Sequence, residues 1–264
     1  MEFFKNENRH KMKKLENKTV FITGGLSGIG KACAMASAKE GANVAVADMK
    51  SDTVDQAMQE IRNENPNAIF LECDVSVFAQ VENAIQKTVS AFGTLDVALN
   101  NAGIGGEPDK VGDMGEQAWL KVIGVNLNGV FNGMKHELTQ MLKQKRGVII
   151  NMSSILGKVG FATSSHYVAA KHGVIGLTQT AALEYAADGI RINAICPAFI
   201  DTPLLTKGGF DVHADVKQQI VAMHPMKRLG KSEEIAAAFI FLACDDSSFM
   251  TGTAMEIDGG FLAQ

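Results

Sequence analysis

A tyrosine and a lysine stand four positions apart in "SSHYVAAKHG", residues 164–173. On a helix such residues share a face, with Cβ atoms roughly 5–6 Å apart. A free phenol has a pKa of about 10, too high for a good proton acceptor at neutral pH. A neighbouring ammonium stabilises the phenolate, so the spacing predicts that Lys171 lowers the pKa of Tyr167 and makes it a general acid/base. The alternative is a surface pair without function, since the spacing Y-x-x-x-K often occurs by chance.

Other polar residues are candidates for the same site. Ser153 and Ser154 end a predicted strand, at the level where hydroxyls face a ligand bound at the carboxyl edge of a sheet. Asn126 lies in an apolar helical stretch, where asparagine is intrinsically unfavourable. Asn128 shares this setting, so composition alone does not choose between the two asparagines.

A glycine-rich turn, "TVFITGGLSGIGKA", follows the first predicted strand and contains Gly24, Gly28 and Gly30. Glycine permits positive φ and lets a ligand approach the backbone. The helix that follows directs free N–H groups at the turn, which suits a pyrophosphate. An ordinary strand–helix turn could look the same. An acid about 20 residues further on favours a dinucleotide site.

That acid is Asp48, at the end of the second predicted strand. Its carboxylate can accept hydrogen bonds from the adenosine ribose hydroxyls and would repel a 2′-phosphate. Leu26 and Ser27 in the turn are neutral, Met49 follows the acid, and the nearest cation, Lys50, comes one position late. The sequence therefore favours NAD over NADP, although Asp48 could instead only cap the next helix.

Apolar β-rich runs alternate with helical patterns along the chain, which is typical of βαβ units. The predicted strands are 19–23, 43–48, 68–74, 96–101, 147–153, 190–196 and 253–258, and the predicted helices are roughly 28–40, 51–64, 78–92, 115–144, 166–187 and 232–243. The pattern predicts an α/β, Rossmann-like, doubly wound sheet of about seven parallel strands with helices on both faces.

One domain is expected over residues 15–264, because no linker or repeat divides the chain. Residues 1–14 are expected to form a flexible polar tail. The segment 198–230 interrupts the alternation of strands and helices, and a connection of that length usually forms a lid or binding loop.

Composition narrows the functional classes. The chain has 264 residues and a net charge of −4, and no apolar run approaches the length of a membrane span. Its mild acidity argues against a nucleic-acid or membrane partner. The four cysteines form no CxxC pair, so they are expected to be reduced thiols of a cytoplasmic protein, without a disulfide framework or metal site.

Together these features resemble the short-chain dehydrogenase/reductase superfamily in its single-domain form. The matching pieces follow the family's order from about residue 15 to the C-terminus: "TGGLSGIG", "CDV", "NNAG", "VN", "NMSS", "YVAAK", "NAICPA", "TG" and "DGG". The resemblance implies that Ser154 polarises the substrate oxygen and Tyr167 exchanges the proton. It also implies that Lys171 lowers the pKa of Tyr167 and holds the nicotinamide ribose, and that Asn126 holds a water linking Lys171 to solvent.

The cofactor contacts follow from these positions and from the resemblance. The expected residues are Gly24, Ser27, Gly28, Ile29, Gly30, Asp48, Met49, Asp74, Val75, Asn101, Ala102, Gly103, Tyr167, Lys171, Pro197, Ile200 and Thr202. The family commonly has Pro-Gly after the sixth strand, where this chain has Pro197-Ala198, so Ala198 is not counted as a contact.

The substrate pocket is expected from the segments 104–110, 155–165 and 198–227. Its apolar candidates are Ile155, Leu156, Phe161, Phe199, Leu204, Leu205, Phe210, Met223 and Met226. As a set they favour an apolar ketone or secondary alcohol over a charged substrate. The predicted function is NAD(H)-dependent interconversion of a secondary alcohol and a ketone. The family usually forms homotetramers through helices at 115–144 and 166–187 and through C-terminal contacts.

Several other functions are compatible with parts of this pattern. A 3-oxoacyl-carrier-protein reductase has the same motifs but would prefer NADPH and a basic docking surface, against which Asp48 and the acidic net charge argue. A hydroxysteroid or polyol dehydrogenase stays open, and a non-catalytic dinucleotide-binding sensor is disfavoured by the retained Ser154, Tyr167 and Lys171. A hydrolase is disfavoured because no G-x-S-x-G elbow occurs, and a zinc alcohol dehydrogenase because the chain lacks clustered ligands.

Overall fold

A parallel sheet in the strand order β3-β2-β1-β4-β5-β6-β7 forms the centre of the molecule, in a computed structural model that describes residues 13–206 and 214–264. The strands are β1 (Thr19–Thr23), β2 (Asn43–Asp48), β3 (Ala68–Glu72), β4 (Val97–Asn100), β5 (Gly147–Met152), β6 (Ile190–Pro197) and β7 (Ala254–Ile257). All neighbouring strands pair in parallel. The predicted doubly wound, seven-stranded α/β fold is confirmed.

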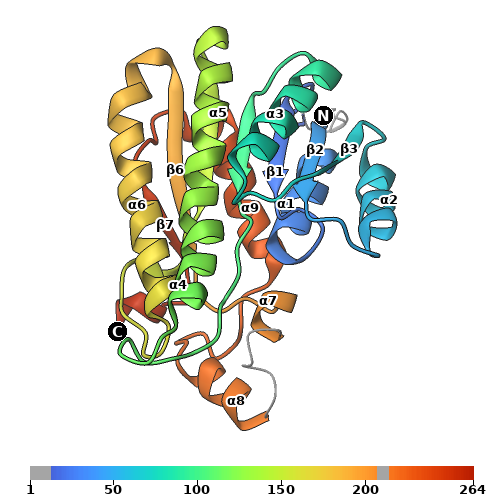
Figure 1. Ribbon diagram of the computed structural model, residues 1–264. Coiled ribbons are helices and arrows are strands. Elements are labelled where there is room, and N and C mark those ends of the chain that lie inside the picture. Colours follow the sequence, from blue (N-terminus) through green and yellow to red (C-terminus); the bar gives the residue numbers. More distant parts are fainter. Residues whose placement is uncertain (1–12, 207–213) are drawn as a thin grey trace, which may run out of the picture.

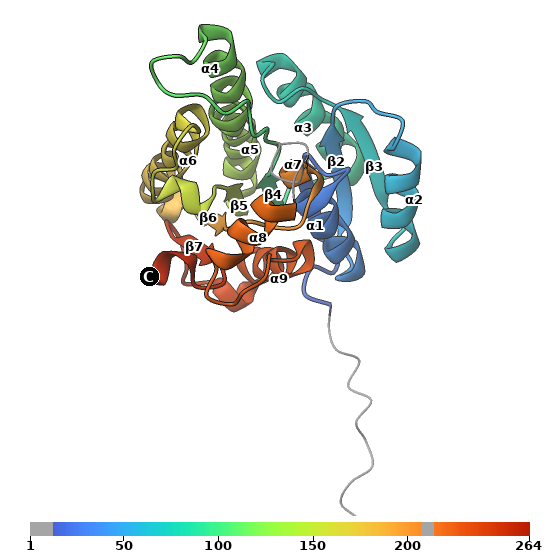
Figure 2. The same cartoon turned by 90° about the horizontal axis from the view of Figure 1, so that it is seen from below.

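Helices cover both faces of this sheet (Figures 1 and 2). The helices are α1 (Gly28–Lys39), α2 (Val54–Glu64), α3 (Phe78–Phe92), α4 (Glu116–Ile123), α5 (Gly129–Gln144), α6 (Ser165–Tyr185), α7 (Pro203–Leu205), α8 (Ala214–Ala222) and α9 (Ser232–Ala243). One buried cluster joins the sheet to α1, α2 and α9, and a second joins it to α3, α5 and α6. The sheet is therefore the middle of three layers.

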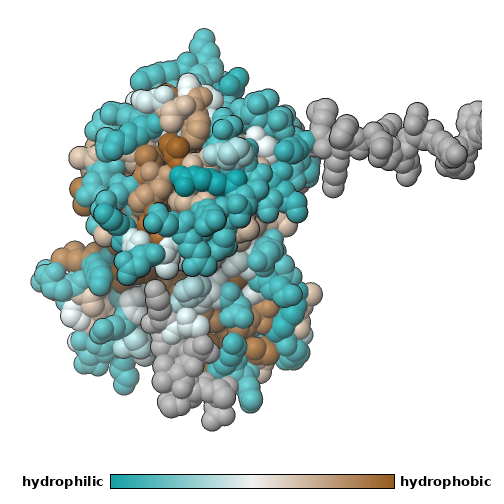
Figure 3. Space-filling model, turned by 90° about the vertical axis from the view of Figure 1, so that its right-hand side faces the viewer, coloured by the Kyte–Doolittle hydropathy of each residue, from teal (hydrophilic) through white to brown (hydrophobic). Residues whose placement is uncertain are grey.

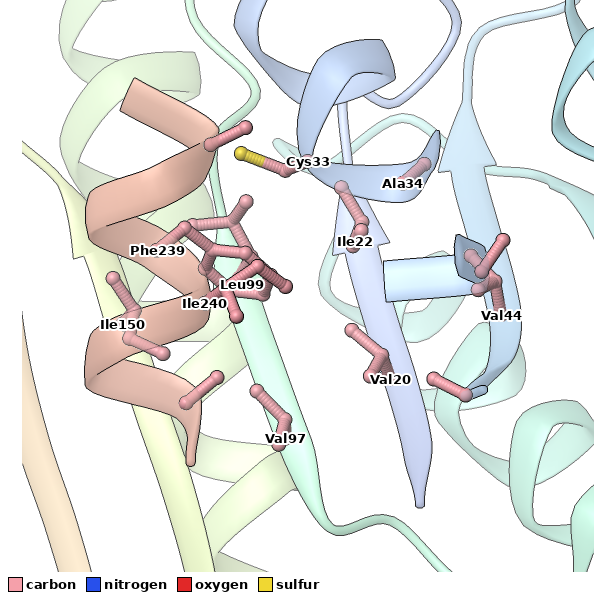
Figure 4. Packing of buried hydrophobic residues seen from close by; sticks show 14 of the residues in the cluster. Val20, Ile22, Cys33, Ala34, Val44, Val97, Leu99, Ile150, Phe239 and Ile240 are labelled. Carbon is pink, nitrogen blue, oxygen red and sulfur yellow. The ribbon is translucent and has the colours of Figure 1, made fainter. Parts of the chain in front are cut away.

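The alternation of side chains along β1 shows why the sheet is apolar on both faces. Val20 and Ile22 belong to the cluster under α1 and α9, whereas Phe21 belongs to the opposite cluster. Figure 4 shows Phe239 and Ile240 of α9 packed over the strands of this first cluster. Strands buried on both faces read as continuous apolar runs, which is the pattern that made them predictable.

The strand order reverses between β1 and β4, and this switch point positions the site. In open α/β sheets, ligands bind in the crevice outside the carboxyl ends of the strands at such a point. The glycine turn after β1 and the segments after β4, β5 and β6 all meet at this edge.

Two elements differ from the prediction. The helix expected over 115–144 contains a π-helical segment, Gly124–Asn128, between α4 and α5. The long connection 198–230 contains α7 and α8. Most of the expected tail, residues 1–12, lies outside the described residues, while Lys14 donates its backbone N–H to Glu40 and pairs through Nζ with Asp246 at 2.7 Å.

Within 13–206 and 214–264, no helix combines the length and apolarity needed to cross a bilayer. The same residues contain no group of three His, Cys, Asp or Glu side chains arranged to bind a metal ion. The four cysteines are free and buried.

Candidate active site

A cavity of about 490 Å³ opens at the carboxyl edge of the sheet. Its walls come from the turns after β1 to β6 and from α6 and α7. Every residue predicted for catalysis or cofactor binding lines it, except Gly30 and Asn126. The sequence pattern and the fold thus bring the predicted residues to one place.

Gly30 lies behind the cavity and allows α1 to pack against the glycine turn. A Cβ at this position would stand 2.0 Å from the Gly24 carbonyl oxygen and 2.6 Å from Nδ2 of Asn101. Gly24 itself has φ +65°, and a Cβ there would stand 2.8 Å from Cα of Ala102. The turn after β1 and the turn after β4 therefore touch through their backbones, which only glycine permits.

Asn101 fastens these two turns together. Its Nδ2 donates to the carbonyl oxygens of Thr23 and Gly24 at 3.1 and 3.0 Å, and its N–H is bound by Oγ1 of Thr23 at 3.0 Å. The side chain predicted as a cofactor contact thus also fixes the shape of the cradle.

The N-terminus of α1 is open toward the cavity. Its N-cap, Ser27, makes no side-chain capping hydrogen bond, and the first turn contains no acidic residue. The first N–H groups of a helix have no partner within the helix, and the helix dipole favours an anion there. Ser27, Gly28 and Ile29 line the cavity at this point, so the chain fits a dinucleotide's pyrophosphate.

Asp48 closes the far side of the glycine turn. Its carboxylate accepts the N–H groups of Leu26 at 3.0 Å and Met49 at 2.8 Å. Burial raises the pKa of Asp48, while these two backbone hydrogen bonds act in the opposite direction. The carboxylate keeps lone pairs free toward the cavity that it lines, where ribose hydroxyls could donate.

Asp74 and Val75 follow β3 and line the same end of the cavity. Oδ1 of Asp74 accepts the N–H and the hydroxyl of Ser76 at 2.9 and 2.7 Å. These contacts hold the turn that carries Val75.

Tyr167 and Lys171 lie one turn apart on α6 and both face the cavity, together with Ser154. Nζ of Lys171 lies 5.5 Å from the centroid of the Tyr167 ring and donates to the Met152 carbonyl at 2.7 Å. The lysine is 3% exposed, and burial lowers its pKa to about 8. Ser154 also accepts the Leu156 N–H at 3.1 Å, which orients its hydroxyl group.

The Tyr167 pKa is raised rather than lowered as expected. Burial raises the pKa of Tyr167 to about 12, because the phenolate loses hydration, and the Ser154 hydroxyl opposes this effect only in part. Lys171 does not contribute to the shift. Its ammonium is itself desolvated and is directed at Met152, so the four-residue spacing did place the two side chains together, but the predicted lowering of the Tyr167 pKa was wrong.

Asn126 lies in the π-helical segment and is fully buried. Its Oδ1 accepts the Ile104 N–H and its Nδ2 donates to the Ile104 carbonyl, both at 2.8 Å. The side chain therefore pins the segment that follows β4 and "NNAG". A direct catalytic role for Asn126 stays a proposal.

Six of the predicted apolar pocket residues line the cavity: Ile155, Leu156, Phe161, Phe199, Leu204 and Leu205. Met223 is not among the lining residues, and Met226 lines a second cavity of about 130 Å³ instead. Phe210 lies outside the described residues. Ala198, which was not counted, borders both cavities.

Sequence reasoning missed other lining residues. Lys121 and Val125 contribute from α4 and the π-helical segment, and their four-residue spacing on one helix was a usable signal. The remaining missed residues are Ala47, Cys73 and Met152. Each of them stands one position before a residue that the sequence analysis singled out. Their residue types gave no signal of a role in the site.

Comparisons with known proteins identify the family. A family model described as "Enoyl-(Acyl carrier protein) reductase" matches residues 24–262. A cyclohexanol dehydrogenase from Acinetobacter sp. (strain SE19) is 40% identical over 251 residues, covering 95% of this chain and 97% of its own. A 3-oxoacyl-(acyl-carrier-protein) reductase from Thermotoga maritima is 39% identical, covering 94% and 99%.

A solved structure has the same fold as this chain. The crystal structure of levodione reductase superposes with a TM-score of 0.91 at 37% sequence identity, covering 94% of this chain and 99% of that chain. The glycine turn, the Ser-Tyr-Lys group at one sheet edge and these full-length matches lead to one assignment. The chain belongs to the short-chain dehydrogenase/reductase superfamily of oxidoreductases.

Proposed function

We propose that this protein is an NAD(H)-dependent oxidoreductase that interconverts a secondary alcohol and a ketone. The observation that carries this proposal is the stack of Tyr167 and Lys171, which lies beside Ser154 in the same cavity as the glycine turn. One cavity thus holds a proton-transfer group and a cradle suited to a dinucleotide. When bound, the dinucleotide supplies hydride donation or acceptance.

The chain's own residues handle the oxygen and its proton. Ser154 and Tyr167 present hydroxyls on the cavity wall, where both can hydrogen-bond one carbonyl or carbinol oxygen. In reduction Tyr167 gives its proton to that oxygen, and its raised pKa keeps the hydroxyl protonated until then. In oxidation Tyr167 takes the proton. Nζ of Lys171 lies 5.5 Å from the ring centroid, and turning the ammonium from the Met152 carbonyl toward the phenolate would stabilise that charge.

Asp48 supports the preference for NAD(H) over NADP(H). It is an acidic group on the cavity wall at the end of β2, and Lys50, the nearest cation in sequence, does not line the cavity. A 2′-phosphate placed against this carboxylate would meet a like charge at short range.

Exchanging Asp48 for asparagine tests this preference. Asp48→Asn keeps an acceptor for the Leu26 N–H but removes the charge, so the ratio of kcat/KM for NADPH to that for NADH should rise about tenfold or more. Initial rates with both cofactors measure the ratio. Asp52→Ser, which removes an exposed carboxylate outside the cavity, is the matched control. A ratio that stays at the wild-type value in Asp48→Asn would exclude this role of Asp48.

The apolar lining supports a small hydrophobic carbonyl substrate, because the substrate side presents Ile155, Leu156, Phe161, Phe199 and Leu204. The Acinetobacter relative is named for a cyclic secondary alcohol, cyclohexanol, and the levodione reductase structure has the same fold. A panel of cyclic, aliphatic, aryl and steroid ketones, assayed by NADH oxidation, tests the class. Highest kcat/KM for a compact cyclic ketone is the expected result, and turnover of none of these ketones would contradict the proposal.

A second candidate is reduction of a 3-oxoacyl group on acyl carrier protein. The Thermotoga relative is named for this reaction, and the family description names the same carrier protein with an enoyl group. The NAD-type acid Asp48 and the net charge of −4 oppose it, since an acidic carrier needs a basic docking surface. Including a 3-oxoacyl thioester, free and carrier-bound, in the same panel separates the two candidates.

We further propose a cytoplasmic homotetramer whose subunit consists of one domain from residue 15 onward. The α2 side of the molecule is mostly hydrophilic (Figure 3). In contrast, Phe131 of α5 and Leu183 of α6 are 50% and 86% exposed. Exposed apolar side chains on neighbouring helices support a subunit interface there. Light scattering on the purified protein measures the subunit number.

A further inference from the structure

A buried polar cluster lies between the catalytic edge of the sheet and helices α5 and α6. It joins Glu137 of α5, Asn100 of β4, Asn151 of β5 and Thr178 of α6, and none of these residues is more than 2% exposed. In the part of the chain that the structure describes, no basic side chain pairs with Glu137. Burying an unpaired, ionised carboxylate costs folding free energy, so the protonation state of Glu137 has to be considered.

Hydrogen bonds lead outward from Asn100, to Glu137 on one side and to Asn151 and Thr178 on the other. Nδ2 of Asn100 donates to Oε2 of Glu137 and to Oδ1 of Asn151, both at 3.0 Å. Nδ2 of Asn151 donates to Oγ1 of Thr178 at 2.9 Å, and Thr178 donates to the Val174 carbonyl at 2.7 Å. Two buried oxygens of the cluster are left without a partner: Oε1 of Glu137 and Oδ1 of Asn100.

Both of these oxygens border Gly133. The point where a Cβ on Gly133 would stand is 2.1 Å from Oδ1 of Asn100 and 3.1 Å from Oε1 of Glu137. If Glu137 is ionised, both oxygens are acceptors and neither can satisfy the other. If Oε1 carries a proton, it becomes a donor, and the carboxyl group and the Asn100 amide form a reciprocal pair.

We propose that Glu137 is a neutral carboxylic acid that donates from Oε1 to Oδ1 of Asn100, and that it is a positioning residue for the catalytic edge. With this proton, both oxygens that lack a partner acquire one. Asn100 precedes Asn101, which fastens the glycine turn. Asn151 precedes Met152, whose carbonyl holds Lys171. One carboxyl group thus anchors both the cofactor cradle and the support of the catalytic lysine.

The electrostatics agree with this geometry. Burial raises the pKa of Glu137 to about 8, against the lowering effect of the Asn100 hydrogen bond, and no charged group contributes. Asn100, which donates to the carboxyl, and Gly133 lie against it, and Asn151 and Thr178 continue the hydrogen bonds from Asn100; none of these residues titrates.

Infrared spectroscopy tests the protonation state directly and needs no ligand. Difference spectra between wild type and Glu137→Gln at pH 7 should show the C=O stretching band of one neutral carboxylic acid, which fades as the pH rises beyond about 8. A carboxylate band in place of the neutral one at pH 7 would overturn the proposal. Glu64→Gln, which removes an exposed carboxylate at the end of α2, should give a carboxylate band and serves as the control.

Unfolding equilibria test the same point by a second route. Because the folded state holds a proton that the unfolded chain releases above its ordinary pKa of 4.5, wild type should lose stability relative to Glu137→Gln as the pH rises from 4.5 to about 8. The ratio of their unfolding constants should change up to tenfold per pH unit in that window and stay constant above it. A ratio that does not change with pH would contradict the neutral acid.

The positioning role is tested with Glu137→Met, which keeps the length of the side chain but cannot bind Asn100. This variant should bind NADH about tenfold or more weakly than wild type in a fluorescence titration, while Glu137→Gln stays close to wild type. Equal affinity in Glu137→Met and wild type would remove the positioning role. This readout alone depends on the proposed function: failure of wild type itself to bind NADH would count against that function and leave the infrared and unfolding results intact.

Discussion

Tyr167→Phe should lower kcat by roughly 10²–10⁴-fold, the range that general acid/base catalysis contributes. The substitution removes only the hydroxyl oxygen and leaves the ring, which lies 5.5 Å from Nζ of Lys171, in its place. Without that hydroxyl, the cavity loses the group that we propose exchanges the proton with the substrate oxygen in both directions. NADH affinity should change little, because the glycine turn and Asp48 are untouched.

The chain provides its own control for this experiment. Tyr185, the only other tyrosine, ends the same helix and does not line the cavity. Tyr185→Phe should therefore retain turnover, while Tyr167→Phe loses it at unchanged NADH affinity. Turnover in Tyr167→Phe close to that of wild type would refute the assigned proton donor, and a parallel loss of NADH binding would indicate a structural role instead.

Most of the site residues could be predicted from the sequence, because helical spacing and the ends of strands determine where they lie. The four-residue spacing of Tyr167 and Lys171 fixes a shared helix face, and both side chains do face the cavity. The ends of apolar strands mark one edge of a parallel sheet, so the sequence predicts that Asp48, Asn101 and Ser154 lie together, and all three line the cavity. Helical periodicity and the ends of the predicted strands therefore suffice to bring together residues that are far apart in the sequence.

Features that depend on tertiary contacts could not be predicted in this way. The raised pKa of Tyr167 reflects burial, which spacing does not report. The π-helical segment coincides with the paired hydrogen bonds between Asn126 and the Ile104 backbone, a contact across 22 positions. In contrast, the burial of Glu137 could be predicted from the sequence. Glu137 stands at helical spacing from Met134 and Met141, which are buried, so a carboxylate interrupts an apolar stripe of the helix.

Gly30→Ala should weaken NADH binding by about 10²-fold or more and also destabilise the fold. The added methyl would stand 2.0 Å from the Gly24 carbonyl oxygen, well inside any real contact distance, and that oxygen belongs to the backbone of the cradle. Either α1 or the turn must shift. Overpacking of this kind typically costs roughly 1–3 kcal/mol of stability, and a displacement of about 1 Å at a binding site can cost 10²-fold.

Two measurements and a matched substitution separate the consequences of this change. NADH titration reports the geometry of the turn, and thermal unfolding reports the strain. Gly112→Ala is the control, because nothing lies within 4 Å of a Cβ there and the residue does not line the cavity. It should leave both readouts near wild type. If Gly30→Ala bound NADH as tightly as Gly112→Ala, the close packing of α1 on the turn would not be what shapes the cradle, and the phosphate-binding role of that helix end would have to be abandoned.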